Sequence, residues 1–398
     1  MTKKRMIVAG VMSGTSADGI NVALVRMDER LGSRQSTHSH ANFQLLGHAE
    51  FSYPKKVRAA VLAGMNASRA SVADLSRLNF LLGELYSDAV LATERQFRVK
   101  ANLVGCHGQT LYHQGEPQRF LGRRIAATWQ TGEAAIVAAR VGAPVVSDFR
   151  SADLATGGKG APLVPFLDYW LFRDAQTGRI VQNIGGIANL TMISAGATAD
   201  DVVAFDTGPG NMVIDAVTEK LFGLPFDRGG RIAASGKVFA PVIHELLRRG
   251  FFRRSPPKTA GREEFGREFV RDFLRNCKRC RTQDVVATAT ALTAKSIADA
   301  VQRYAAQKSG SSRKLGFEEM ILSGGGAKNS TLVTMLTNDL APLGLRLRFS
   351  DEFGLPSAAK EAVAFAVLAH ETWQGRPSSL PSATGAKRAA VLGKISYP

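Results

Sequence analysis

The stretch RMIVAGVMSGTSADGINVALVRMD, residues 5–28, sets the fold class of this chain. Two apolar runs rich in β-branched residues, 5–12 and 21–28, flank a short polar segment that contains glycine. This pattern predicts a β-hairpin. A third apolar run at 43–51 predicts another strand, after a polar segment at 30–41 that is expected to form a surface loop.

The same order of elements recurs about 170 residues further on. Apolar runs at 179–183 and 188–194 predict a second hairpin, a third run follows at 201–205, and a helix is expected from about residue 211. The repeat lies in the order of the elements and not in residue identity. It predicts a chain built from two similar halves.

Strands and helices alternate in the rest of the chain, which is typical of an α/β protein. A long amphipathic helix is expected from residue 71 to about 96, because Ser71 and Asp74 have capping-box spacing. The other expected elements are strands at 102–106, 125–128, 144–149 and 319–322, and helices at 131–141 (capped by Thr131), from about 329, and at 358–372.

Composition excludes several classes of protein. The 398 residues are 45% hydrophobic and 21% charged, which excludes a wholly disordered chain. Three cysteines are too few for a disulfide framework and suit a reducing compartment. No uncharged apolar run is long enough to cross a membrane. Residues 1–12 imitate a signal peptide but lead into no cleavage site, so we expect a cytoplasmic protein.

The net charge of +17 is compatible with nucleic acid, a membrane surface or anionic small molecules as partners. Much of it lies in segments such as 248–267 and 271–281, and the first of these is rich in Gly and Pro and is expected to be an exposed loop. No nucleic-acid module accompanies it, so a solvated or anion-facing loop is favoured. Cys277 and Cys280 have redox or half-zinc spacing, but ordinary thiols are favoured without a second pair.

Three glycine-rich turns, at 14–19, 185–186 and 324–326, each follow an apolar strand. None matches the P-loop or the G-x-G-x-x-G pattern, and each alone is compatible with a structural turn. Glycine lets backbone N–H groups approach a phosphate closely. Because two of the turns occupy equivalent places in the repeated halves, we predict a nucleotide held between two lobes.

Asp206 is the sharpest candidate for a catalytic residue. It ends a predicted strand before Gly-Pro-Gly, where a carboxylate can accept a proton from a hydroxyl or a water during phosphoryl transfer. The alternative is a cap for the following turn. Asp148 and Asp153 are either substrate ligands or a salt-bridge network around Arg150, and His107 either contacts a ligand or packs after its strand.

The chain resembles the anhydro-N-acetylmuramic acid kinase family of the sugar kinase, Hsp70 and actin superfamily. The matching motifs run nearly end to end: GVMSGTSADG (10–19), CHGQT (106–110), SDFRSADLATGGKGAPLVP (147–165), NIGGIAN (183–189), FDTGPGN (205–211), FDRGG (226–230), PPKTAGREEF (256–265), LSGGGAKN (322–329), EAVAFAVLAH (361–370) and LPSATGAKRAAVLGKISYP (380–398).

This resemblance implies an α/β fold with two lobes, the actin-like ATPase (ribonuclease H-like) fold, with a duplicated βββαβα core and an ATP cleft between the lobes. The first lobe would be 1–150, completed by about 365–398, and the second would be 151–364. It also implies that the enzyme uses ATP and Mg²⁺ to open the anhydro bond of 1,6-anhydro-N-acetylmuramic acid and phosphorylate O6. The products would be N-acetylmuramic acid 6-phosphate and ADP, in murein recycling.

The implied partners are a small-molecule sugar and a second copy of the chain, without nucleic acid or membrane. Asp206 would be the base that activates water, and Asp18 would be a Mg²⁺ ligand. The residues implied to bind nucleotide are Gly14, Thr15, Ser16, Ala17, Asp18, Gly19, Ile20, Asn21, Gly185, Gly186, Gly324, Gly325 and Gly326, and those implied to bind sugar are Gln109, Thr110, Arg150 and Glu361.

Two departures from the family pattern leave alternatives open. Asn21 stands where the family often has Asp, and Lys159 where it usually has Gln. The first can alter a contact near Mg²⁺, and the second adds a charge beside the expected sugar segment. Another sugar kinase of the superfamily, or a sensor that binds sugar or nucleotide without turnover, therefore stays open.

Overall fold

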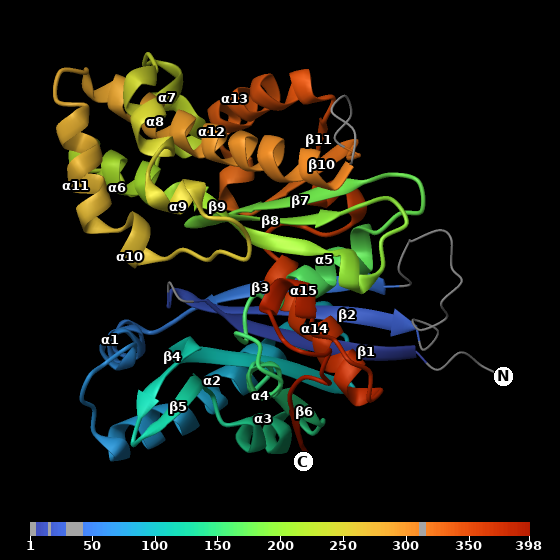
Figure 1. Ribbon diagram of the computed structural model, residues 1–398. Coiled ribbons are helices and arrows are strands. Elements are labelled where there is room, and N and C mark those ends of the chain that lie inside the picture. The colour runs from blue at the N-terminus through green and yellow to red at the C-terminus, as the bar shows by residue number, and fades with distance from the viewer. Residues whose placement is uncertain (1–4, 15–16, 29–42, 310–315) are drawn as a thin grey trace. The chain divides into compact units, whose positions relative to one another are not determined.

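The computed structural model describes residues 5–14, 17–28, 43–309 and 316–398. Its contacts divide the chain into two compact units (Figure 1). Unit 1 comprises Met1–Leu171 and Ala359–Pro398, and unit 2 comprises Phe172–Ala358. The polar segment at 30–41 lies outside the described residues. Within them, every helix is too short or too polar to span a bilayer.

Unit 1 contains a sheet with strand order β12-β6-β4-β1-β2-β3, and β5 pairs with β4. β2 is antiparallel to β1 and β3, whereas β4 is parallel to β1 and β6. The bounds are β1 Arg5–Ser13, β2 Gly19–Asp28, β3 Phe43–Ser52, β4 Leu103–Phe120, β5 Arg123–Thr131, β6 Val145–Ser147 and β12 Lys394–Ser396.

Helices cover both faces of this sheet. On one face, α2 and α3 share a hydrophobic core with Ala9 and Val11 of β1. Successive residues of a strand point to opposite faces, so Gly10 faces the other side, where the backbone of α14 packs against it. The helices of unit 1 are α1 Lys55–Gly64, α2 Val72–Phe97, α3 Ala134–Val141, α4 Ser151–Ala155, α5 Pro165–Phe172 (which ends at the boundary), α14 Lys360–Trp373 and α15 Pro381–Thr384.

Unit 2 contains a sheet with strand order β11-β10-β7-β8-β9. β8 is antiparallel to β7 and β9, and β10 is parallel to β7 and β11. The strands are β7 Arg179–Ile184, β8 Ile187–Ile193, β9 Val203–Pro209, β10 Glu319–Ser323 and β11 Arg346–Phe349. The α-helices are α6 Asn211–Phe222, α7 Arg231–Ala234, α8 Ala240–Leu247, α9 Gly250–Arg253, α10 Arg262–Phe265, α11 Arg267–Asn276, α12 Thr282–Ser309 and α13 Ser330–Leu340.

The two sheets share one topology. In each, the central strand (β1 or β7) has an antiparallel neighbour (β2 or β8), to which the third strand (β3 or β9) is antiparallel in turn. On its other side lie two parallel strands, β4 and β6 in unit 1 and β10 and β11 in unit 2, and unit 1 adds β5 and β12. The repeat predicted from element order is therefore confirmed at the level of strand order.

Some element boundaries differ from the prediction for local reasons. α3 begins at Ala134, because the Glu133 carboxylate accepts a hydrogen bond from the Ala135 N–H. Thr131 is not a cap but ends β5 and donates its hydroxyl to the Gln109 carbonyl. Ser71 does cap α2, by accepting from the Asp74 N–H.

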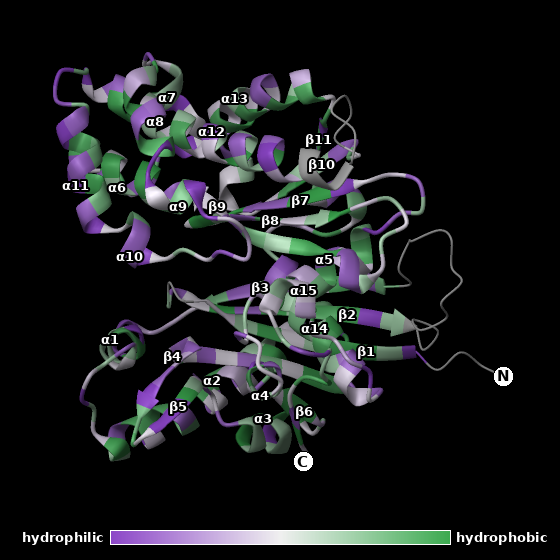
Figure 2. Ribbon diagram, viewed as in Figure 1, coloured by the Kyte–Doolittle hydropathy of each residue, from purple (hydrophilic) through white to green (hydrophobic). Residues whose placement is uncertain are grey.

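The expectation of an exposed loop at 248–267 is wrong in part. The segment contains α9 and α10, and Phe251, Phe252 and Phe265 are buried in one aromatic cluster. These rings bring the segment into the core of unit 2 despite its charge. Downstream, α11 buries Val270 and Phe273, and Figure 2 shows this helix banded in hydrophilic and hydrophobic colours.

The division into units falls beyond the expected residue 150. Residues 151–171 belong with unit 1 because they are tied to its C-terminal part. The buried Asp153 accepts from the Thr384 hydroxyl at 2.7 Å, and Asp168 forms a buried ion pair of 2.7 Å with Lys360. The chain returns to unit 1 at Ala359, where about 365 was expected.

Candidate active site

The first glycine turn links β1 and β2 in unit 1. The Ala17 N–H donates to the Gly14 carbonyl at 3.1 Å, and Ala17 has a φ of 53°. Gln109 of β4 holds this turn, because its Nε2 donates to the Gly14 carbonyl and its Oε1 lies 2.7 Å from the Ser13 hydroxyl oxygen. Thr15 and Ser16, which are predicted to bind nucleotide, lie outside the described residues.

The residues that follow this turn divide into exposed and buried ones. Ala17 and Ile20 belong to the hydrophobic core, so a ligand can reach them only through their backbone. Asp18 is exposed and pairs with Arg58 at 3.1 Å, and Asn21 Oδ1 lies 3.1 Å from His48 Nε2. The exposed ion pair is weak, which leaves the Asp18 carboxylate able to exchange Arg58 for another cation.

The carboxylate chemistry of this turn fits a Mg²⁺ ion that the protein coordinates only in part. Nowhere in the described ranges do three His, Cys, Asp or Glu side chains gather to hold a metal. Mg²⁺ commonly keeps several waters and uses one or two carboxylates plus substrate phosphates. Asp18 would be the protein ligand of such a site.

Arg150 is fixed by His107 at the predicted sugar segment. The His107 Nδ1 lies 2.8 Å from the Gly108 carbonyl, so Nδ1 carries the proton and Nε2 is the acceptor. Arg150 donates to that Nε2 from Nε at 3.1 Å and lies 2.9 Å from it through Nη2, while Nη1 donates to the Gly160 carbonyl. Burial, reinforced by Arg150, lowers the pKa of His107 well below its usual range, so this histidine stays neutral.

The other predicted sugar residues have distinct surroundings. Glu361 lies in the first turn of α14, where burial of its carboxyl group raises its pKa and the charges of Lys360 and Arg150 oppose that change. The Thr110 hydroxyl accepts from Gln130 at 3.2 Å. Lys159 pairs with Glu116 at 2.7 Å, so its additional charge is matched within unit 1.

Asp148 and Asp153 do not form the expected salt-bridge network around Arg150, because among the described residues each carboxylate bonds other partners. Asp153 is fully buried and accepts from the Gly160 N–H as well as from Thr384. Asp148 accepts from the Ser151 hydroxyl at 2.5 Å and pairs with Lys394. Both carboxylates thus hold the segment that carries Arg150.

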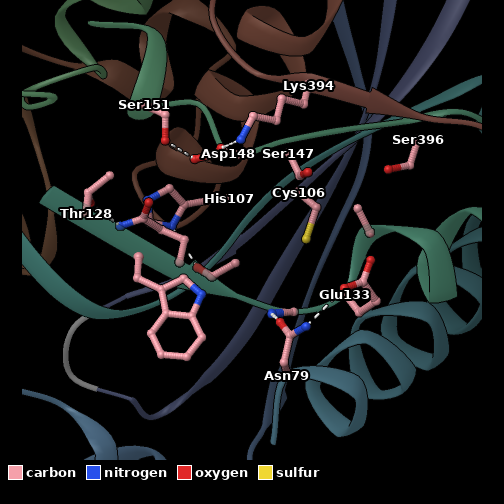
Figure 3. Close-up of a pocket in the computed structure, with 15 residues that line it drawn as sticks. Asn79, Cys106, His107, Thr128, Glu133, Ser147, Asp148, Ser151, Lys394 and Ser396 are labelled. Carbon is pink, nitrogen blue, oxygen red and sulfur yellow. Dashed lines mark hydrogen bonds and ion pairs between the residues drawn. The ribbon is translucent and has the colours of Figure 1, made fainter. Parts of the chain in front are cut away.

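A pocket of about 460 Å³ lies in unit 1 beside His107. Figure 3 shows Asp148 between Ser151 and Lys394 at one side of it, and Asn79 beside Glu133 at the other. Its lining is mainly polar and consists of Asn79, Cys106, His107, Gly108, Thr128, Trp129, Gln130, Gly132, Glu133, Ala134, Ser147, Asp148, Ser151, Lys394 and Ser396. None of the four predicted sugar residues lines it.

In unit 2 the glycine turns at 185–186 and 324–326 differ in whether packing requires glycine. A Cβ on Gly324 or Gly326 would clash with Asn183 or Ile184, at 2.6 Å and 2.3 Å, so packing requires both. A Cβ on Gly185 or Gly186 would approach no atom closer than 3.5 Å, and neither has a left-handed φ. Packing therefore does not require glycine at these two positions.

The β7–β8 turn also supports the start of α6. The N–H groups of Gly210 and Met212 donate to the Gly186 carbonyl, and that of Asn211 donates to the Gly185 carbonyl at 2.7 Å. A Cβ on Gly325 would lie 3.4 Å from Asn211 Nδ2. The glycine turns at 185–186 and 324–326 therefore meet beside the first residue of α6.

Asp206 is partly exposed and lies in the middle of β9, because the strand does not end there as predicted but pairs with β8 as far as Pro209. Its Oδ2 accepts from the Ala260 N–H at 2.7 Å, and this is the only hydrogen bond of the carboxylate within the described part of the chain. Burial raises the pKa of Asp206 to about 6, the Ala260 N–H and Lys258 lower it, and Glu263 raises it. A carboxylate with one oxygen fixed and a pKa near neutrality is suited to accept a proton.

Sequence reasoning missed two residues here. Lys258 was placed in a solvated loop, yet it is buried and lies beside Asp206. Asp215 of α6 has its pKa raised to about 6 by burial alone, and its side chain forms no hydrogen bond to any described residue. Lys258 lies in the family motif at 256–265, but neither that motif nor any pattern around Asp215 predicts burial, because long-range packing causes it in both cases. Cys277 is buried, and all three cysteines are free thiols.

The duplicated sheet, with glycine turns at equivalent hairpins and Asp206 within β9, is that of the two-lobed actin-like kinase fold. The chain belongs to the anhydro-N-acetylmuramic acid kinase family, whose model matches residues 6–398.

Individual relatives agree with this family. An anhydro-N-acetylmuramic acid kinase of Bacillus cereus is 40% identical over 396 residues, covering 99% of this chain and 100% of the relative. That of Bacillus thuringiensis (strain Al Hakam) is 39% identical over 396 residues, with 99% of both covered. Among solved structures, the activator of the 2-hydroxyisocaproyl-CoA dehydratase from Clostridium difficile with bound ADPNP has a TM-score of 0.41 and 12% identity, covering 93% of this chain and 96% of that one.

Proposed function

We propose that the protein is an ATP-dependent kinase that opens the anhydro bond of 1,6-anhydro-N-acetylmuramic acid and phosphorylates O6, in cell-wall recycling. The products are N-acetylmuramic acid 6-phosphate and ADP. Family membership over nearly the whole chain supports this function, and the setting of Asp206 is the observation that carries its chemistry. We expect the protein to act in the cytoplasm as a homodimer on a free sugar.

In this proposal Asp206 is the general base. With Oδ2 held by the Ala260 N–H, Oδ1 accepts a proton from the water that attacks the anomeric carbon C1. The C1–O6 bond breaks, and O6 attacks the γ-phosphorus of ATP while ADP leaves. Asp206 later returns its proton to solvent.

In unit 2 the nucleotide would use the backbone at Gly185, Gly186 and Gly325. Asp18 would hold Mg²⁺ through water, and the ion, when bound, neutralises charge on the phosphates. On the sugar side, the Arg150 guanidinium suits the carboxylate of the lactyl group, and Glu361 can accept from hydroxyls. His107 and the Gly160 carbonyl fix the orientation of that guanidinium.

Two alanine substitutions separate ligand glycines from packing glycines. Gly186→Ala is expected to raise the KM for ATP about tenfold or more, because its Cβ occupies space for phosphate, and to leave the Tm nearly unchanged. Gly326→Ala is expected to lower the Tm, because its Cβ would lie 2.3 Å from Ile184 Cγ2. Thermal unfolding with ATP titrations checks both, and an unchanged KM in folded Gly186→Ala would remove that turn from the nucleotide site.

The pH profile is expected to report Asp206. The base works only when ionised, so kcat/KM should fall about tenfold per pH unit below its pKa, which burial raises to about 6. Asp215→Asn is the matched control, since burial also raises the pKa of Asp215 to about 6. If the acid limb of kcat/KM disappears in Asp215→Asn, the limb reports Asp215, and the assignment to Asp206 is wrong.

Sugar-dependent release of ADP tests the function itself. We expect ADP from ATP with the anhydro sugar, and little with N-acetylmuramic acid or N-acetylglucosamine. A clear preference for another sugar hydroxyl would support a different kinase of the superfamily. Saturable ATP binding without turnover of any sugar would support a sensor instead.

A further inference from the structure

Lys258 lies in a cage of three aromatic rings within unit 2. It is only 6% exposed, and its Nζ lies 4.8 Å from the centroid of Phe251 and 5.8 Å from those of Phe205 and Tyr304. Among the described residues Nζ donates a single hydrogen bond, to the Phe251 carbonyl at 3.3 Å. A buried ammonium has three donors to satisfy, and here the faces of the rings stand in for missing acceptors.

The cage also fastens the chain that follows α9. Arg303 and Tyr304 of α12 donate to the carbonyls of Phe252 and Arg254, at 3.0 Å and 2.8 Å, beside the Lys258 bond to Phe251. Carbonyls at the end of a helix lack intrahelical partners, so side chains that reach them fix the local backbone. Lys258 therefore ties segment 254–261 back onto α9.

The same segment holds Asp206 on two sides. The Asp206 N–H donates to the Lys258 carbonyl at 3.0 Å, and the Ala260 N–H donates to Asp206 Oδ2 at 2.7 Å. Phe205, one wall of the cage, is the residue before Asp206. A shift of the Lys258 side chain is thus transmitted to the carboxylate through both neighbours.

We propose that Lys258 is a positioning residue for Asp206: its caged ammonium anchors segment 254–261 so that the Ala260 N–H fixes the carboxylate. This inference rests on the proposed function only where Asp206 is taken as the base. The anchoring itself follows from the contacts of Lys258 and is measurable without turnover.

The charges around Asp206 and Lys258 determine how loss of the Lys258 anchor changes the pKa of Asp206. Asp206 is influenced by Lys258 and Glu263, and Lys258 by Arg303, Asp299, Arg254 and Asp206. The Ala260 hydrogen bond and the Lys258 charge both lower the pKa of Asp206. Loss of the anchor is therefore expected to move the acid limb of kcat/KM to higher pH.

The test compares Lys258→Met and Lys258→Arg with Lys278→Met, a change at an exposed lysine of the same unit. In Lys258→Met we expect kcat to fall about 10–100-fold with the KM values within about threefold, and the acid limb to rise by about half a pH unit or more. The Ala260 amide should exchange hydrogen about tenfold faster or more. Lys258→Arg, which keeps charge and donors, should recover part of each change, and Lys278→Met should match the wild type.

A folded Lys258→Met protein with wild-type kcat, acid limb and Ala260 exchange would overturn the proposal. If that variant does not fold, Tyr304→Phe replaces it, because it keeps the ring and removes only the bond to the Arg254 carbonyl. Faster Ala260 exchange and lower kcat are then expected, and no change in either would overturn the anchor. A wild-type protein without sugar-dependent turnover would refute the proposed function, whereas the exchange rates would still decide the anchor.

Discussion

Asp206→Asn is expected to lower kcat on the order of 10³-fold or more. Asparagine can still accept the Ala260 hydrogen bond but cannot take a proton from the attacking water. The same change should not lower the Tm. Because burial raises the pKa of Asp206 to about 6, the ionised carboxylate opposes folding at neutral pH, and a neutral amide removes that cost.

Steady-state kinetics and thermal unfolding of Asp206→Asn check both expectations. Asp200→Asn, at an exposed position of the same unit, is the matched control and should change neither quantity. Near-normal turnover in Asp206→Asn would show that another group is the base. A clearly lower Tm would show that the carboxylate serves folding, as the capping alternative requires.

Gly10→Ala is expected to have the largest effect on stability. A Cβ at this position would lie 1.8 Å from the Ala362 carbonyl oxygen and 2.8 Å from the Ala366 nitrogen, both in the backbone of α14. Relief requires α14 to move away from β1, which opens the core of unit 1. We expect a loss of about 3 kcal/mol or more, and a Tm lower by about 6–12 °C.

Gly250→Ala is the control for this prediction, because no atom lies within 4 Å of its added Cβ and its φ is not left-handed. It should leave the Tm unchanged or slightly higher, as alanine is the better helix former. If the Tm of Gly10→Ala were no lower than that of Gly250→Ala, α14 would not approach β1 as closely as described.

Strands were predictable from the sequence where burial within a sheet produces an apolar run. The runs at 5–12 and 179–183 became β1 and β7, and their neighbours followed the predicted hairpins. The run at 102–106 became the much longer strand Leu103–Phe120. Its far half is exposed and polar, so pairing with β5, rather than a buried face, extends it, and periodicity does not detect that.

The purpose of each glycine was not predictable from the motif that contains it. Gly10 lies in a glycine-rich motif, yet it is required by α14, which enters about 350 residues later in the chain. Only contacts between distant segments distinguish packing glycines from those that leave room for a ligand.

The basic segments show the same limit. Arg267, Arg271 and Arg275 lie on the exposed face of α11, in keeping with a solvated surface, whereas Lys258 lies in the core. Local composition is alike in both places. The aromatic side chains that enclose Lys258 come from β9, α9 and α12, so the cage appears only when the chain is folded.

The central claim is that water opens the anhydro ring while O6 takes the phosphoryl group. Turnover of ATP and the anhydro sugar in ¹⁸O-labelled water, followed by mass spectrometry of the product, tests it most directly. We predict one ¹⁸O in the anomeric hydroxyl and none in the phosphate of N-acetylmuramic acid 6-phosphate. An unlabelled anomeric oxygen, or label in the phosphate, would contradict this mechanism.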